Sequence, residues 1–182
     1  MTIYSPAEDS YLLQNVLKKL KLEKDLKVLD VGTGSGIQAQ TLKKLGIKNI
    51  TTADINPEAV KLSKKLGFKS IKSNLFSNIP PEDKFDLIVF NPPYLPENKE
   101  EPKDSKTETT GGKNGSELIN KFLKQARNHL TKEGKIILLN SSLTKKINWL
   151  DYKKKKLAEK KLFFERLLVW NLQSPDNFIE FG

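Results

Sequence analysis

The sequence predicts an α/β fold in which a seven-stranded, mostly parallel sheet carries helices on both faces. Short apolar runs alternate with amphipathic segments from residue 26 to residue 142, as in chains that build parallel sheets. Right-handed crossovers place the carboxyl ends of such strands at one edge, where ligands bind. The two clearest motifs, DVGTGSG at 30–36 and NPPY at 91–94, both lie where a predicted strand ends.

Strands are predicted from apolar runs bounded by turn residues. The first five are expected at residues 26–32, 48–55, 68–75, 85–90 and 135–142, of which 68–75 is the weakest and 85–90 the strongest. Residues 156–172 are predicted as two further strands that meet near Phe163 to Glu165. Residues 91–115 form a long polar loop, of the kind that is usually functional or disordered. No repeat or linker is visible, so residues 1–182 are expected to form one domain.

Helices are expected where apolar residues recur at helical spacing. The first begins near Pro6 or Ala7, because Ser5 can cap it and the acids Glu8 and Asp9 suit its positive end. The other helices are expected at residues 36–45 before Gly46, from Asn56-Pro57 to near Gly67, at 116–130, and, as a short helix, at 143–150.

The composition narrows the possible functions. A net charge of +10 favours RNA, DNA, a ribonucleoprotein or an acidic protein as partner, or else reflects a lysine-rich solvated surface. The chain has no cysteine and one histidine, His129, which excludes disulfides, a cysteine nucleophile and a multi-histidine metal site. We therefore expect no metal and a structural role for His129. No membrane-spanning run or secretory signal is visible, so a cytoplasmic protein without membrane contact is expected.

The loop after the first strand predicts a nucleoside-type cofactor. Gly32, Gly34 and Gly36 are spaced G-x-G-x-G, whereas the dinucleotide fingerprint is G-x-G-x-x-G. Asp30 would repel a pyrophosphate but suits the ammonium group of a methionine moiety. Asp54 ends the second strand, where a carboxylate can accept hydrogen bonds from both ribose hydroxyls. These features favour S-adenosylmethionine.

Three further residues are predicted to complete the cofactor site. Ile55 follows the ribose-binding acid directly. Asn74 and Leu75 follow the third strand, and the topology places them near the adenine, although an asparagine there is also an ordinary turn residue.

The motif after the fourth strand predicts chemistry at a planar nitrogen. Pro92 and Pro93 fix the backbone, and Asn91 adds a side-chain carbonyl. The Asn91 side chain and the Pro92 carbonyl can together accept both hydrogens of one NH₂ group, while Tyr94 lies against the planar group that carries it. Two acceptors orient a poorly nucleophilic nitrogen and stabilise the charge that develops on it. The sequence therefore predicts an N-methyltransferase.

These motifs resemble the HemK/PrmC family, the glutamine methyltransferases of class I translation release factors. Three segments carry the resemblance: YSPAEDSYLL at 4–13, DVGTGSG with DINPEA at 54–59, and NPPYLP at 91–96 with GGKNG at 111–115. The opening segment resembles the short archaeal and eukaryotic branch, which lacks the N-terminal helical domain of the bacterial enzymes. The resemblance implies a Rossmann-like class I methyltransferase fold.

The resemblance also implies residue roles. Ser10 would contact the carboxylate end of the cofactor, Asp30 and Gly32 the methionine part, and Asp54 the ribose. In the same way, adenine would lie beside the residues after the third strand, where the family usually has aspartate instead of Asn74. The side chain of Asn91 would bind the substrate amide.

The implied substrate is the glutamine of a Gly-Gly-Gln loop on a class I release factor, and the implied partner is a small zinc-binding activator. Two alternatives stay open: a nucleic-acid methyltransferase acting on adenine or guanine amines, and a non-catalytic cofactor-binding subunit. The C-terminal region contains a group of lysines that could face RNA or the ribosome, or could form a solvated hairpin: Lys153 to Lys156, with Lys160 and Lys161.

Overall fold

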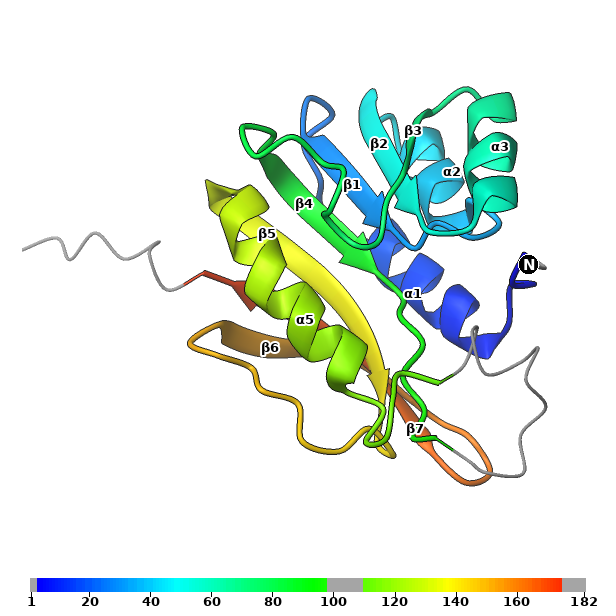
Figure 1. Cartoon of the computed structure of the whole chain (residues 1–182), viewed down its shortest axis with the longest axis vertical. Coiled ribbons are helices and arrows are strands. Elements are labelled where there is room, and N and C mark those ends of the chain that lie inside the picture. The colour runs from blue at the N-terminus through cyan, green and yellow to red at the C-terminus, as the bar shows by residue number, and fades with distance from the viewer. Residues whose placement is uncertain (1–2, 98–109, 175–182) are drawn as a thin grey trace, which may run out of the picture.

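The computed structural model describes residues 3–97 and 110–174 and contains the predicted seven-stranded sheet (Figure 1). The strands are β1 Lys27–Val31, β2 Asn49–Asp54, β3 Lys69–Lys72, β4 Phe85–Phe90, β5 Leu130–Ser141, β6 Lys153–Lys161 and β7 Arg166–Gln173. Their order across the sheet is β3-β2-β1-β4-β5-β7-β6. Strands β1 to β5 pair in parallel, and β7 lies antiparallel between β5 and β6. The mostly parallel sheet is therefore confirmed.

Helices cover both faces of this sheet, as predicted. They are α1 Glu8–Lys19, α2 Ile37–Lys44, α3 Pro57–Lys65 and α5 Glu117–Ala126, which continues into the 3₁₀ turn η1 Arg127–His129. Alternation along β4 explains the two layers, because successive side chains of a strand point to opposite faces. Leu87 and Val89 pack with the α1 and α2 residues Leu17 and Leu42, whereas Ile88 packs with residues of α5.

Helix α3 belongs to the same face as α2. In β2, Ile50 joins the apolar cluster under α1 and α2, and Thr52 points the same way by alternation. The Thr52 hydroxyl lies 2.8 Å from the hydroxyl of Ser63 on α3. Asn56 caps α3 by accepting from the Glu58 N–H at 3.0 Å, which confirms the predicted Asn-Pro helix start.

Two local predictions were wrong. The N-cap of α1 is Ala7, and no side chain caps this end, so Ser5 does not perform the predicted role. Residues 143–150 contain turns but no helix. Several of their polar groups bond elsewhere instead: the Lys145 N–H donates to the Asn114 carbonyl at 2.9 Å, and the Asn148 N–H donates to the Asn120 side chain at 2.8 Å.

The C-terminal hairpin is present, with β6 starting three residues earlier than predicted. Lys153 to Lys156 are exposed on β6, one of the two edge strands of the sheet. Lysines on an edge strand discourage pairing with another chain, which gives this run a structural explanation. At the hairpin turn, Phe163 and Phe164 are exposed and contact each other edge to face.

His129 is structural, as expected. Its side chain is buried, stacks on Phe76 with ring centroids 4.8 Å apart, and bonds through Nδ1 with the Asp83 carbonyl at 2.9 Å. Across residues 3–97 and 110–174, no helix has the length and apolar character needed to cross a membrane.

Candidate functional site

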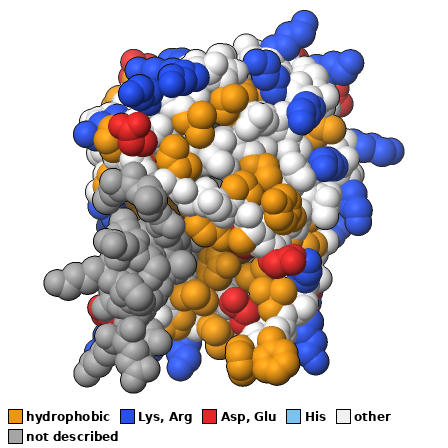
Figure 2. Space-filling model, turned by 90° about the vertical axis from the view of Figure 1, so that its right-hand side faces the viewer, with side chains coloured by type: hydrophobic (Ala, Val, Ile, Leu, Met, Phe, Trp, Pro, Cys, Tyr) orange, Lys and Arg blue, Asp and Glu red, His pale blue; other side chains and the backbone are white. Residues whose placement is uncertain are grey.

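A cavity of about 770 Å³ opens at the carboxyl ends of β1, β2 and β4. Figure 2 looks toward this end of the sheet and shows hydrophobic side chains around a hollow, with basic side chains nearer the margin. Most of the predicted site residues line the cavity: Ser10, Asp30, Gly32, Gly34, Asp54, Ile55, Asn74, Leu75, Asn91, Pro92, Pro93 and Tyr94. The fold therefore brings both sequence motifs and the start of α1 into one space.

Asp30 is the penultimate residue of β1 and has a buried carboxyl group. Burial raises its pKa to about 7, the nearby negative charge of Asp54 adds to this, and a 2.7 Å hydrogen bond from the Thr33 hydroxyl works in the opposite direction. The groups that lower the pKa of Asp30 are the Thr33 hydroxyl and the Ala39 backbone, both neutral, so its negative charge is poorly compensated. A cation bound here would favour its charged form.

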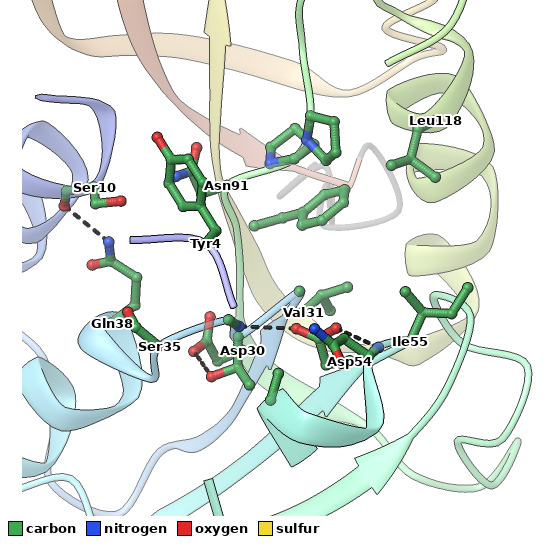
Figure 3. A pocket seen from close by; sticks show the side chains of 18 of the residues that line it. Tyr4, Ser10, Asp30, Val31, Ser35, Gln38, Asp54, Ile55, Asn91 and Leu118 are labelled. Atoms are coloured by element: carbon green, nitrogen blue, oxygen red, sulfur yellow. Dashed lines mark hydrogen bonds between the residues drawn. The ribbon is translucent and has the colours of Figure 1, made fainter. Parts of the chain in front are cut away.

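Asp54 ends β2 and faces the same loop. Its oxygens accept 2.9 Å and 2.8 Å hydrogen bonds from the backbone N–H groups of Gly34 and Asn56 (Figure 3). Burial raises the pKa of Asp54, while these bonds lower it. A carboxylate offers about four lone-pair directions, so it can still accept from hydroxyl groups in the cavity.

Gly36 has a different position from the other loop glycines, because it does not line the cavity. It is the N-cap of α2, with φ +77, and a Cβ there would lie 3.1 Å from Leu66. Its role is to let the loop turn into α2 through the left-handed region.

The residues predicted beside adenine lie at the other wall. Leu75 is buried and adopts φ 55, an uncommon conformation for leucine, and Asn74 is exposed at the rim. Ile55 is 51% exposed although it lines the cavity, and Figure 3 shows it opposite Leu118 of α5. An apolar slot between such side chains suits a flat ring.

Asn91 directly follows β4, and only one of its two polar side-chain atoms has a hydrogen-bond partner. Its Nδ2 donates to Asp9 Oδ2 at 3.0 Å. Its Oδ1 is buried and has no hydrogen-bond partner. A buried acceptor without a partner costs about 1–3 kcal/mol, so such an atom at a cavity wall marks a place where a donor is expected to bind.

Tyr94 packs against both apolar clusters of the sheet. Burial raises the pKa of its phenol, and the negative charges of Asp9 and Glu165 add to this. The phenol therefore stays neutral at ordinary pH and cannot act as a phenolate base. Pro92 is buried and Pro93 half-buried beside it.

The glycine-rich segment predicted behind the motif packs directly against it. The Gly111 N–H donates to the Leu95 carbonyl at 3.0 Å. A Cβ on Gly111 would lie 2.6 Å from the Pro93 carbonyl oxygen, and one on Gly115 would lie 2.4 Å from that of Tyr94. Only glycine permits this close approach. Residues 98–109 of the predicted polar loop lie outside the described residues.

Several residues that line the cavity were not predicted from the sequence, and three of them carry polar side chains close to the start of α1. Gln38 is buried, donates to the Ser10 carbonyl at 2.9 Å, and keeps its Oε1 without a partner. The Tyr4 hydroxyl donates to Asp9 at 3.0 Å and its ring lies near Asn91 in Figure 3. The acid at position 9 was assigned only to the helix end. Local sequence position did not reveal these side chains, because the cavity that they face is lined mainly by residues that follow β1, β2 and β4.

Comparison with known proteins agrees with this site. The family model for the methyltransferase small domain matches residues 8–160. A protein of Methanocaldococcus jannaschii, provisionally named a protein N5-glutamine methyltransferase, is 40% identical over 93% of this chain and 90% of its own length. The human methyltransferase HEMK2 is 30% identical over 75% of this chain and 71% of its own length.

A solved structure shares the whole fold. It is the E. cuniculi Mtq2–Trm112 complex responsible for methylation of the translation termination factor eRF1. The matched chain is 27% identical with a TM-score of 0.75, over 95% of this chain and 99% of that one. The extent of these matches shows that the chain belongs to the methyltransferase small domain family, among the HemK-type protein N5-glutamine methyltransferases.

Proposed function

We propose that this chain transfers a methyl group from S-adenosylmethionine to the side-chain amide nitrogen of the glutamine in the Gly-Gly-Gln loop of a class I release factor. The observation that carries the proposal is the Asn91 Oδ1 atom, a buried acceptor without a partner, in the same cavity as Asp30 and Asp54. The names of relatives support the choice of glutamine as acceptor, and the complex that methylates eRF1 supports a termination factor as substrate.

The cavity fits the cofactor chemically. Asp54 would accept from the ribose hydroxyls, and Ile55 and Leu75 would enclose the adenine with Asn74 at its edge. Asp30 and the Gly32 backbone would face the methionine part. Two polar groups, the Ser10 side chain of α1 and the unpaired Gln38 Oε1 of α2, would bind its charged end. When bound, S-adenosylmethionine supplies a methyl group on a positively charged sulfur.

The residues of the motif orient the nitrogen. Asn91 Oδ1 and the Pro92 carbonyl would accept the two hydrogens of the amide NH₂, and Tyr94 would support its plane. So held, the nitrogen would be aimed at the methyl carbon; it would accept the methyl group as the sulfur leaves with the carbon–sulfur electron pair, and the methylated amide would lose one proton to water. Aligned acceptors lower the barrier because they stabilise the positive charge that develops on nitrogen.

The acceptor can be identified by mass spectrometry. The full chain is incubated with isotope-labelled S-adenosylmethionine and a release factor, with a Gly-Gly-Gln to Gly-Gly-Ala variant of that factor, or with RNA and DNA. We expect label on the loop glutamine and none on the variant. Label on adenine or guanine amines, with none on the release factor, would replace the proposal with nucleic-acid methylation.

We also propose that a small zinc-binding activator subunit assists the chain, since the Mtq2 structure is a complex with Trm112. Such a partner should raise turnover or thermal stability when mixed with the chain at equal concentration. Unchanged turnover and unchanged melting temperature with candidate activators would remove this part of the proposal.

A further inference from the structure

One acid of α1 contacts the motif at the end of β4. Asp9 is 4% exposed and accepts the Asn91 Nδ2 hydrogen bond through Oδ2 at 3.0 Å. Its Oδ1 accepts from the Ser10 N–H at 2.6 Å and from the Tyr4 hydroxyl at 3.0 Å. Asp9 and Asn91 are 82 residues apart in the sequence, so this contact exists only in the folded chain.

The geometry determines which end of the Asn91 amide faces the cavity. An ionised carboxylate only accepts hydrogen bonds, so it can hold the NH₂ end of the amide but repels the carbonyl end. A flipped Asn91 would place Oδ1 against Oδ2 of Asp9. The carboxylate is itself fixed by the helix backbone and by Tyr4, and it therefore selects the orientation in which Oδ1 remains available as an acceptor.

We propose that Asp9 is a positioning residue that holds the Asn91 carbonyl toward the substrate NH₂ group. The part of this inference that concerns the substrate rests on the proposed function; the part that concerns the amide orientation does not. The charge of Asp9 also polarises the Asn91 amide, which makes Oδ1 a stronger acceptor. As positive charge develops on the substrate nitrogen, both Oδ1 and the carboxylate behind it stabilise that charge.

The competing explanation is that Asp9 only stabilises the start of α1, where acids are favourable. Glu8 provides a matched control, because it lies in the same first turn but is exposed and pairs with Lys160 of β6. A helix-end role predicts similar losses of stability in Glu8→Gln and Asp9→Asn, with no selective loss of turnover in either.

The activity test compares Asp9→Ala, Asp9→Asn and Glu8→Gln. We expect kcat to fall about 30- to 100-fold in Asp9→Ala, with the affinity for S-adenosylhomocysteine within about tenfold of the unmodified chain. Asp9→Asn keeps an acceptor oxygen but loses the charge, so its kcat should lie between that of Asp9→Ala and that of the unmodified chain. Glu8→Gln should stay within about twofold. Equal decreases of kcat in Asp9→Asn and Glu8→Gln would overturn the positioning role. So would an effect of the Asp9 substitutions on cofactor affinity alone, with kcat unchanged.

A second measurement needs no substrate. In protein labelled with ¹⁵N-asparagine, the Asn91 side-chain signals are assigned by their absence in Asn91→Ala. We expect their hydrogens to exchange with solvent at least about tenfold faster in Asp9→Ala, and in Asp9→Asn if the alanine variant does not fold. Unchanged exchange and unchanged chemical shifts would refute the inference, whatever the protein methylates. Faster exchange in a chain that does not methylate the release factor would refute only the proposed function.

Discussion

The cofactor side and the substrate side of the cavity are built in different ways. At the ends of β1 and β2, the acids bond to the loops that directly follow these two strands, as Asp30 does to Thr33 and Asp54 does to Asn56 and Gly34. At the end of β4, Asn91 depends on an acid of α1. The glycine segment that supports the motif is also remote, as the bridge between Leu95 and Thr110 shows. Mutations on the first side should therefore mainly change cofactor affinity, and those on the second side turnover.

The difference between the two sides is tested most directly by removing the unpaired acceptor, Asn91 Oδ1. In Asn91→Ala, kcat should fall about a thousandfold or more, because the acceptor for the transferring nitrogen is lost. Affinity for S-adenosylhomocysteine should change less than about tenfold. Steady-state kinetics and calorimetry measure the two quantities. Near-normal turnover would show that the amide has no part in the reaction, and a parallel loss of affinity would mean that the two sides are not separable.

The support of the motif by the glycine segment is tested by Gly115→Ala. The added Cβ would lie 2.4 Å from the Tyr94 carbonyl oxygen, so the segment or the motif must move, and kcat should fall about 10- to 100-fold. Gly46→Ala is the matched control: φ is +95 there, but the nearest atom to the new Cβ is a flexible lysine carbon at 3.4 Å.

Gly46→Ala should lose about 1–2 kcal/mol of folding stability, because alanine is strained at positive φ. Gly115→Ala should lose more, because its new Cβ also meets backbone atoms of residues 94–96. Denaturant unfolding measures this cost. Only Gly115→Ala should also lose turnover at a temperature where both are folded. If Gly46→Ala loses turnover equally, the effect is general destabilisation and the motif does not depend on its remote support.

The same difference explains how far the sequence predicts the molecule. Strands such as β4 and the loop at Asp30 follow from apolar runs and glycine spacing, which are local signals. The contact from Asp9 to Asn91 was not predicted, because an acid in a first helical turn has a sufficient local explanation. The prediction of a helix at 143–150 was wrong for a related reason. Polar groups of this segment bond to residues 114 and 120, and no local pattern reveals such contacts.

A smaller effect is expected from pH on the cofactor side. Since the pKa of Asp30 lies at about 7, the carboxylate that would face the ligand ammonium group is fully present above that pH and is lost as the pH falls. Affinity for S-adenosylhomocysteine should therefore be constant near pH 8 and decline below 7, by up to about tenfold per pH unit. Calorimetry from pH 5.5 to 8 measures the slope. Asp30→Asn should bind weakly with no slope, and a slope that persists in this variant would assign the effect to another group.

The smallest predicted effect separates the Thr33 hydroxyl from the rest of the loop. This hydroxyl donates to Asp30 at 2.7 Å and lowers the pKa of that carboxyl group. Thr33→Val preserves the shape of the side chain but removes the donor, so the pKa should rise and the affinity should begin to fall at a higher pH. Turnover at saturating cofactor and pH 8.5 should stay within about threefold, because Asn91 and Asp9 are untouched. If the pH midpoint does not move, or moves down, burial alone controls Asp30. If turnover falls sharply at high pH, the loop after β1 acts on the chemical step, and the division between an affinity side and a turnover side does not hold.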